Sequence, residues 1–239
     1  MKLIKNAVIP ASICDPNVRL SLKGTFDLVQ DYLTEMLGTY RLDGVSLRER
    51  FGCVWIFTRN KIEIDRALLW KERYTVESFL SSAKGAKATV DTLLRGEDGK
   101  IAVYSRVEMC AIDLKTQRIQ RVTDVGVVPE EMVLEPEREL HFGRLKHDEL
   151  SEIASVVVKS EDIDFIQHTN NVSYVRFLMN TYSVKELREH PVCGIEIRYL
   201  GQTHEGDTLS ILKGEKDGKE QFRIALGDMT AIECEIERT

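Results

Sequence analysis

The stretch TFDLVQDYLTEMLGTY at residues 25–40 places apolar side chains at intervals of three and four. This spacing gathers them on one face, so the stretch predicts an amphipathic helix with Thr25 as its N-cap. The stretch NNVSYVRFLMNTYSVKELREH at residues 170–190 has the same spacing between Val172 and Tyr182. It predicts a second long helix.

Segments rich in β-branched and aromatic residues accompany both predicted helices, and turn-forming stretches such as RGEDGK at residues 95–100 separate them. They are expected to be strands of antiparallel meanders. Those of the first half lie at residues 53–59, 61–65, 73–80, 86–94, 100–114 and 118–122. Those of the second half lie at residues 153–160, 193–200, 207–216, 219–227 and 229–238.

The two halves overlay in order with only slight identity. CDPNVRLSLKGTFDLVQDYL falls on DIDFIQHTNNVSYVRFLMNTY, KIEID on GIEIRYL, and EDGK on KDGK. Several weak matches in one shared order favour a duplicated α+β module. We therefore expect two domains, at residues 1–128 and 148–239. The linker between them, residues 129–147, has two prolines, many charges and little periodicity.

Composition excludes several classes of protein. A formal charge of −6 with no long Lys/Arg block disfavours a general nucleic-acid binder. Five scattered cysteines without a CxxC pair argue against a disulfide framework and a thiolate metal site. No run approaches the roughly 18 apolar residues that span a membrane, and no persuasive signal peptide is present. We expect a cytoplasmic protein.

Two motifs of the second half carry a family resemblance. DIDFIQHTNNVSYV followed by IEIRYLGQTHEGDTL resembles the signature of acyl-acyl carrier protein (ACP) thioesterases of the hotdog superfamily. There the motifs run D-x-N-x-H-x-N-N-x-x-Y and Y-x-x-E-x-x-x-G-D. The resemblance implies a tandem double hotdog, in which each long helix is wrapped by an antiparallel sheet and the two units form an internal pseudodimer. It also implies hydrolysis of acyl-ACP without a metal or organic cofactor.

The resemblance places the site in the second half. Asp164 and His168 fall on the family's Asp and His, and Gln202 on its Glu; these three are the expected catalytic residues. Substrate binding and the oxyanion are expected from Ile166, Asn170 and Asn171. Backbone N–H groups at the start of the predicted helix are unpaired within it, so they can hold an oxyanion.

Three positions depart from the family pattern. Ile166 stands where the family has Asn, Gln202 stands where it has Glu, and Thr203 replaces a cysteine of plant members. Since losing one orienting contact commonly lowers a rate by about 10²–10³-fold, a slower enzyme is favoured over an inactive one. Arg19 falls opposite His168 in the overlay, which predicts one active site per chain.

The sequence leaves several alternatives open. Asp164 can act as a general base on water or as a nucleophile. The protein can be an acyl-ACP thioesterase that releases free fatty acid in fatty acid biosynthesis, an acyl-CoA thioesterase, a non-catalytic acyl-thioester or carrier-protein binder, or a hydratase. ACP is the expected partner, with a homodimer undecided. Basic residues that would face ACP, chosen by charge alone, are Arg144, Lys146, Arg176 and Lys185.

Overall fold

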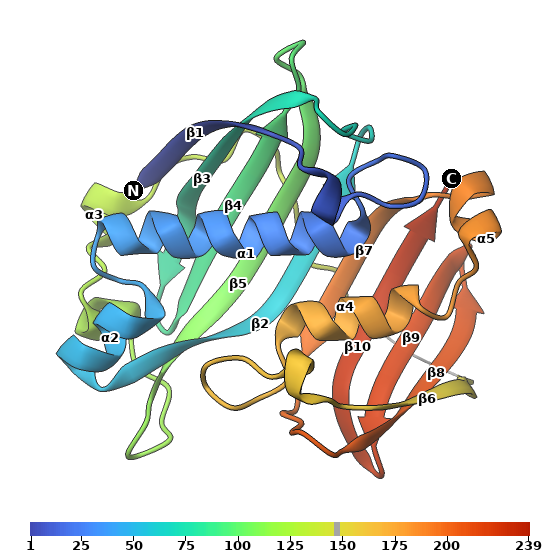
Figure 1. Ribbon diagram of the computed structural model, residues 1–239. Coiled ribbons are helices and arrows are strands. Elements are labelled where there is room, and N and C mark those ends of the chain that lie inside the picture. Colours follow the sequence, from blue (N-terminus) through green and yellow to red (C-terminus); the bar gives the residue numbers. More distant parts are fainter. Residues whose placement is uncertain (146–148) are drawn as a thin grey trace.

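The computed structural model describes residues 1–145 and 149–239, and its described strands join in one antiparallel sheet (Figure 1). The first half contributes β1 (Lys2–Val8), β2 (Cys53–Ile64), β3 (Arg73–Lys84), β4 (Lys87–Arg95) and β5 (Ile101–Asp113). The second half contributes β6 (Ser151–Val157), β7 (Val192–Tyr199), β8 (Thr208–Lys216), β9 (Lys219–Leu226) and β10 (Met229–Arg238). The strand order is β1-β3-β4-β5-β2-β7-β10-β9-β8-β6, so β2 and β7 join the halves.

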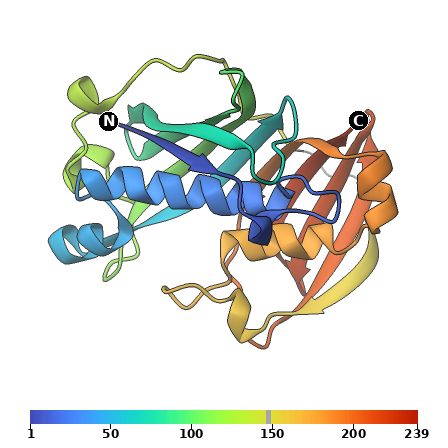
Figure 2. The same ribbon diagram turned by 45° about the horizontal axis from the view of Figure 1, so that its top comes forward.

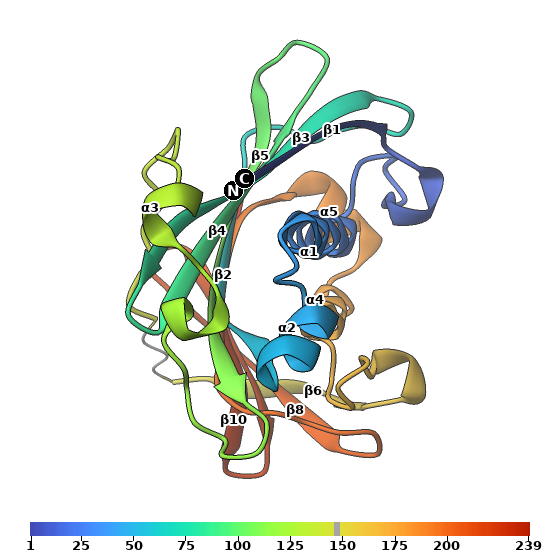
Figure 3. The same ribbon diagram turned by 90° about the vertical axis from the view of Figure 1, so that its left-hand side faces the viewer.

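The main helices lie on the concave face of this curved sheet (Figure 3). The described helices are α1 (Leu22–Thr39), α2 (Gly44–Phe51), α3 (Pro129–Met132), α4 (Asn171–Met179) and α5 (Val184–Glu189). Figure 2 shows α1 and α4 side by side, and the two helices are in contact. None of the described helices is both long and apolar enough to cross a membrane.

Helix α1 buries the apolar face that the sequence predicts, including Phe26, Val29 and Leu33. Its start was predicted wrongly. Ser21 is the N-cap, since its side chain accepts a hydrogen bond from the Gly24 N–H, whereas Thr25 lies inside the helix and its hydroxyl donates to the Ser21 carbonyl. The helix therefore begins earlier than the apolar periodicity indicates.

The element order repeats in the two halves. Each has a strand, a 3₁₀ turn, a helix, a second helix and four strands; the turns are η1 (Ala11–Ile13) and η3 (Ser160–Asp162). At the β2–β7 junction Ile62 pairs with Ile195, and these two residues also coincide in the sequence overlay. An exchange of the halves therefore preserves the register, as an approximate internal twofold axis requires.

Four predicted elements differ in the structure. The helix expected at residues 170–190 is two helices, because Ser183 and Glu186 form a capping box that starts α5. The strands expected at 53–59 and 61–65 are one strand, β2. The strand expected at 118–122 is reduced to an isolated bridge between Ile119 and Ile112, since the chain then turns into the 3₁₀ helix Val122–Val125.

The segment predicted as a linker is packed on the convex face of the sheet where the structure describes it. Lys61 Nζ donates to the His141 carbonyl at 2.9 Å, and Arg138 Nη1 donates to Asp65 Oδ1 at 3.0 Å. The Leu140 side chain is buried there. Residues 146 and 147 of the predicted linker lie outside the described residues. Side-chain contacts from the sheet thus fix the path of the described part.

A buried ion pair supports this convex face, and we expect Asp91→Ala to lower the free energy of unfolding by about 3–5 kcal/mol. Asp91 is fully buried and accepts hydrogen bonds from Arg106 Nη2 at 2.6 Å and Tyr104 Oη at 2.5 Å. Its loss leaves the Arg106 charge uncompensated. Urea unfolding measures the change, with Asp228→Ala in an exposed turn as a control expected within about 0.5 kcal/mol. A loss below about 1 kcal/mol would contradict the prediction.

Candidate active site

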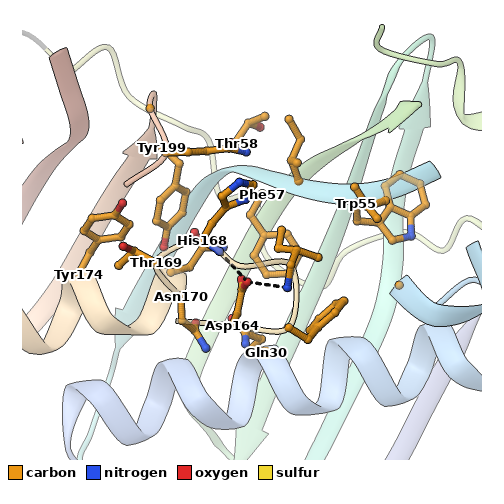
Figure 4. A pocket seen from close by; sticks show the side chains of 18 of the residues that line it. Gln30, Trp55, Phe57, Thr58, Asp164, His168, Thr169, Asn170, Tyr174 and Tyr199 are labelled. Atoms are coloured by element: carbon orange, nitrogen blue, oxygen red, sulfur yellow. Dashed lines mark hydrogen bonds between the residues drawn. The ribbon is translucent and has the colours of Figure 1, made fainter. Parts of the chain in front are cut away.

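A cavity of about 630 Å³ lies between the two halves (Figure 4). Helix α1 and strand β2 line it from the first half, while the loop before α4 and the segment after β7 line it from the second. The structure brings all the predicted site residues to this one cavity: Asp164, Ile166, His168, Asn170, Asn171 and Gln202. The two sequence motifs therefore meet in space.

The Asp164 carboxylate is oriented by the backbone of its own loop. Oδ1 accepts hydrogen bonds from the N–H groups of Ile166 at 2.9 Å and His168 at 3.4 Å, drawn as dashed lines in Figure 4. The turn closes through the Asp164 N–H to the His168 carbonyl at 2.9 Å, with Gln167 at a φ of 66°. Because backbone groups make these bonds, the carboxylate keeps its orientation whatever side chain occupies position 166.

Burial shifts both titratable groups of the loop. It raises the pKa of Asp164, against the opposing effects of the two N–H donors and of His168. Burial, followed by the nearby His204, lowers the pKa of His168. The two imidazole rings meet edge to face with centroids 5.2 Å apart. The site therefore favours a neutral imidazole beside a carboxylate that is more basic than usual.

No side-chain hydrogen bond joins the His168 ring to the Asp164 carboxylate among the described residues. Within the described residues, Nδ1 is buried without a hydrogen-bond partner, and only the backbone N–H of His168 bonds to Asp164. The ring therefore does not hold the carboxylate in place through a hydrogen bond. It lines the cavity, where it can orient water or substrate.

The start of α4 faces the cavity. Asn170 is its N-cap, with Oδ1 accepting from the Val172 N–H at 3.0 Å, while the Asn170 N–H donates to the Asp162 carbonyl at 2.7 Å. Asn171 is the first helical residue, and its N–H has no intrahelical partner. Asn170 thus shapes the helix terminus, and the Asn171 N–H is the donor available to an oxyanion.

Thr203 ties the second motif to the first. It is fully buried, and its hydroxyl lies 2.6 Å from Thr169 Oγ1 and 2.7 Å from Tyr174 Oη. Its carbonyl also accepts from the Thr169 N–H at 2.9 Å. These bonds fix the segment that places Gln202, an exposed side chain, on the cavity wall and His204 beside His168.

The first half contains a matching loop without the imidazole. Asp15 Oδ1 accepts from the N–H groups of Asn17 at 2.8 Å and Arg19 at 3.0 Å, and Val18 has a φ of 63°. Arg19 occupies the position of His168, and its Nη2 donates to the Leu187 carbonyl of α5 at 3.1 Å. The overlay of the two loops is therefore a structural correspondence, with a guanidinium where the second loop has its histidine.

Sequence reasoning missed the part of the wall that the first half provides. Leu33 and Leu37 belong to the apolar face of the helix predicted at residues 25–40, and they line the cavity with Trp55 and Phe57 of β2. No local pattern distinguishes a core position from a cavity position on the same helix face. Tyr199 was also missed, although it is the first letter of the second motif.

Two family models match the chain. The acyl-ACP thioesterase N-terminal domain matches residues 5–128, and the acyl-ACP thioesterase C-terminal domain matches residues 145–236. The chain belongs to the acyl-ACP thioesterase family. The resemblance drawn from the motifs is thus confirmed by models that together span most of the chain.

Relatives and solved structures agree with this membership. An acyl-[acyl-carrier-protein] hydrolase, FATB3, of Cuphea viscosissima is 23% identical over 188 residues, which are 75% of this chain and 45% of the relative. An acyl-ACP thioesterase from Bacteroides thetaiotaomicron matches with a TM-score of 0.91 at 18% identity, covering 100% of this chain and 98% of that one. The 12:0-ACP thioesterase from Umbellularia californica matches with a TM-score of 0.83 at 14% identity, covering 100% and 97%. At these identities the structures show a shared fold, and the chain spans about half the length of its curated relatives.

Proposed function

We propose that the protein hydrolyses the thioester of fatty acyl-ACP and releases free fatty acid and ACP. One observation carries this proposal: the Asp164 carboxylate, the His168 imidazole and the start of α4 line one cavity. These groups match what thioester hydrolysis needs, namely a base, a group that orients water and a donor for the oxyanion. Membership of the acyl-ACP thioesterase family supports it.

The first half offers an apolar surface for an acyl chain. The cavity side chains from α1 and β2 are mainly aliphatic and aromatic, and they include Leu33, Leu37, Val54, Trp55, Ile56 and Phe57. Apolar contact of this kind suits a hydrocarbon chain, while the polar groups of the second half suit its thioester end. In this proposal the two halves divide recognition and chemistry between them.

The hydrolysis can be written as a balanced sequence. Asp164 takes a proton from water while the water oxygen attacks the carbonyl carbon, and the Asn171 N–H holds the resulting oxyanion. Collapse of this intermediate breaks the C–S bond, and the protonated Asp164 returns the proton to the leaving thiolate. His168, neutral, orients the water. Nucleophilic attack by Asp164, which would form an anhydride, is the alternative.

The departures from the family pattern favour a slower enzyme. Ile166 offers no side-chain hydrogen bond, and Gln202 can position water but cannot accept its proton. The rate expected from one lost orienting contact is lower by about 10²–10³-fold. A non-catalytic acyl-thioester binder remains the second candidate because both replacements fall on polar positions of the motifs.

A thiol-release assay tests the proposed function. Purified protein is given acyl-ACP and acyl-CoA substrates with short, medium and long chains, and the free thiol is measured. We expect release from acyl-ACP, with the preferred chain length set by the first-half wall. Absence of thiol release from every substrate would overturn the proposal, whereas release from acyl-CoA alone would favour an acyl-CoA thioesterase.

We also propose that the halves are tandem hotdog units, at residues 1–128 and 148–239, forming an internal pseudodimer. The repeated element order and the β2–β7 register support this division. Among the basic residues expected to face ACP, Arg176 is paired with Asp162, and Lys146 lies outside the described residues. The ACP surface, homodimerisation and a cytoplasmic location stay predictions.

A further inference from the structure

Phe165, which follows the proposed base Asp164, has the most exposed large apolar side chain among the described residues, at 71%. The same side chain lines the cavity. It is carried by the loop before α4, which Figure 1 shows extending toward α2. A ring that is exposed in this way contributes little to the stability of the fold. Because it lies on the rim of a cavity, a ligand in that cavity can bury it.

The Phe165 ring extends from the second half to the first. A Cβ atom placed on Gly44, the first residue of α2, would lie 3.2 Å from Phe165 Cζ and 3.8 Å from Cε2. Gly44 has no positive φ, so its backbone does not require glycine, and the missing side chain leaves room for the ring. Gly44 also lines the cavity. The ring therefore meets α2 at the rim of the cavity.

This meeting point belongs to the apolar part of the cavity. Trp55 Nε1 donates to the Leu42 carbonyl at 2.7 Å, and the Leu42 N–H donates to the Leu37 carbonyl at 2.9 Å. These bonds hold Leu37 and Trp55, which both line the cavity, close to the start of α2. The Phe165 ring approaches the same helix start from the second half. It therefore adds an aromatic surface to the first-half wall that suits an acyl chain.

We propose that Phe165 covers the acyl chain of the bound thioester and makes its affinity depend on chain length. The proposal rests on the proposed thioesterase function, and it adds a second-half residue to an acyl wall that otherwise comes from the first half. Each methylene group that leaves water against the ring strengthens binding, whereas a chain too short to reach the ring gains nothing. Phe165 makes no contact with the reacting atoms in this proposal, so it acts on substrate binding and not on the chemical step.

Phe165→Ala tests the proposal with a series of acyl-ACP substrates from acetyl to lauroyl. We expect KM for lauroyl-ACP to rise about tenfold, which corresponds to the lost burial of roughly two methylene groups. KM for acetyl-ACP should stay within about twofold of the wild type, and kcat should change little at any length. Phe165→Leu keeps an apolar cover and should restore most of the affinity for the lauroyl chain.

Trp70→Ala is the matched control, because it removes an exposed aromatic ring that does not line the cavity. It should show no dependence on chain length. A change in KM that is the same at every chain length, zero included, would overturn the proposal. So would a fall in kcat at every length, since it would mean that Phe165 supports the turn in which the Ile166 N–H orients Asp164.

A binding measurement separates this proposal from the proposed function and from a contact between Phe165 and the carrier protein. Amide analogues of acyl-pantetheine with the same acyl chains are titrated into wild type and Phe165→Ala without ACP. The loss of affinity should again grow with chain length, to about tenfold for lauroyl. No loss in the absence of ACP would overturn the proposal and assign the ring to carrier binding. If the wild type releases no thiol, a loss that grows with chain length would retain Phe165 as the acyl cover and reject hydrolysis.

Discussion

Asp164→Asn is expected to lower kcat for acyl-ACP by about 10²–10⁴-fold, the usual contribution of a general base. The asparagine keeps an oxygen that can accept from the N–H groups of Ile166 and His168. The loop should therefore stay folded and KM should change little. Steady-state thiol release measures kcat. Calorimetry with an amide analogue of acyl-pantetheine, which the enzyme does not hydrolyse, measures binding affinity separately. This combination isolates the loss of a proton acceptor.

The repeated loop supplies a matched control. Asp15→Asn makes the same change in a turn with the same backbone hydrogen bonds, but without a histidine and outside the residues that line the cavity. We expect it to leave kcat within about twofold of the wild type, because general-base catalysis requires direct reach to the water. Equal losses in the two variants would mean that the turn's structure, and not the Asp164 carboxylate, determines the rate.

His168→Ala is expected to lower kcat by about 10²–10³-fold, comparable to the loss of an oriented polar contact in other hydrolases. The ring lines the cavity, so substrate or water is its natural contact. His190→Ala is the control, because His190 is exposed and its ring contacts the Thr239 carbonyl. Unchanged turnover in His168→Ala would remove the ring from the mechanism.

The pH profile adds a second test of His168. Asp164 has a raised pKa and must be ionised, so activity should be lost on acidification before the ordinary aspartate range near 3.9 is reached. His168 has a lowered pKa, so its neutral form should persist below the ordinary value near 6.5. The acid limb of kcat/KM is therefore expected between these values.

His204→Gln tests whether His168 or Asp164 determines the acid limb of kcat/KM. Since His204 lowers the pKa of His168 and Asp164 opposes it, removing the second ring should raise that pKa. If neutral His168 governs the limb, the limb should move to higher pH in His204→Gln. A limb that moves to lower pH would contradict the assignment, and one that does not move would assign the limb to Asp164.

The sequence predicted the secondary structure correctly where a periodic pattern fits only one type of element. The α1 face, most of the predicted strands and the overlay of Ile62 on Ile195 reappear in the structure. Predictions were wrong where a cap overrides periodicity. Ser21 starts α1 before its apolar stripe, and Ser183 starts a new helix inside the second stripe, since side-chain bonds to free N–H groups decide where helices begin.

The sequence by itself determined which residues carry the motifs, because their types and spacing are written along one chain. It placed Asp164, His168 and Gln202 in order, and all three line the cavity. Only the tertiary structure decided what surrounds them. The wall from α1 and β2 and the Thr203 bonds depend on segments far apart in the chain being packed together. Such contacts arise from how the helices and loops pack against the sheet, which no local pattern encodes.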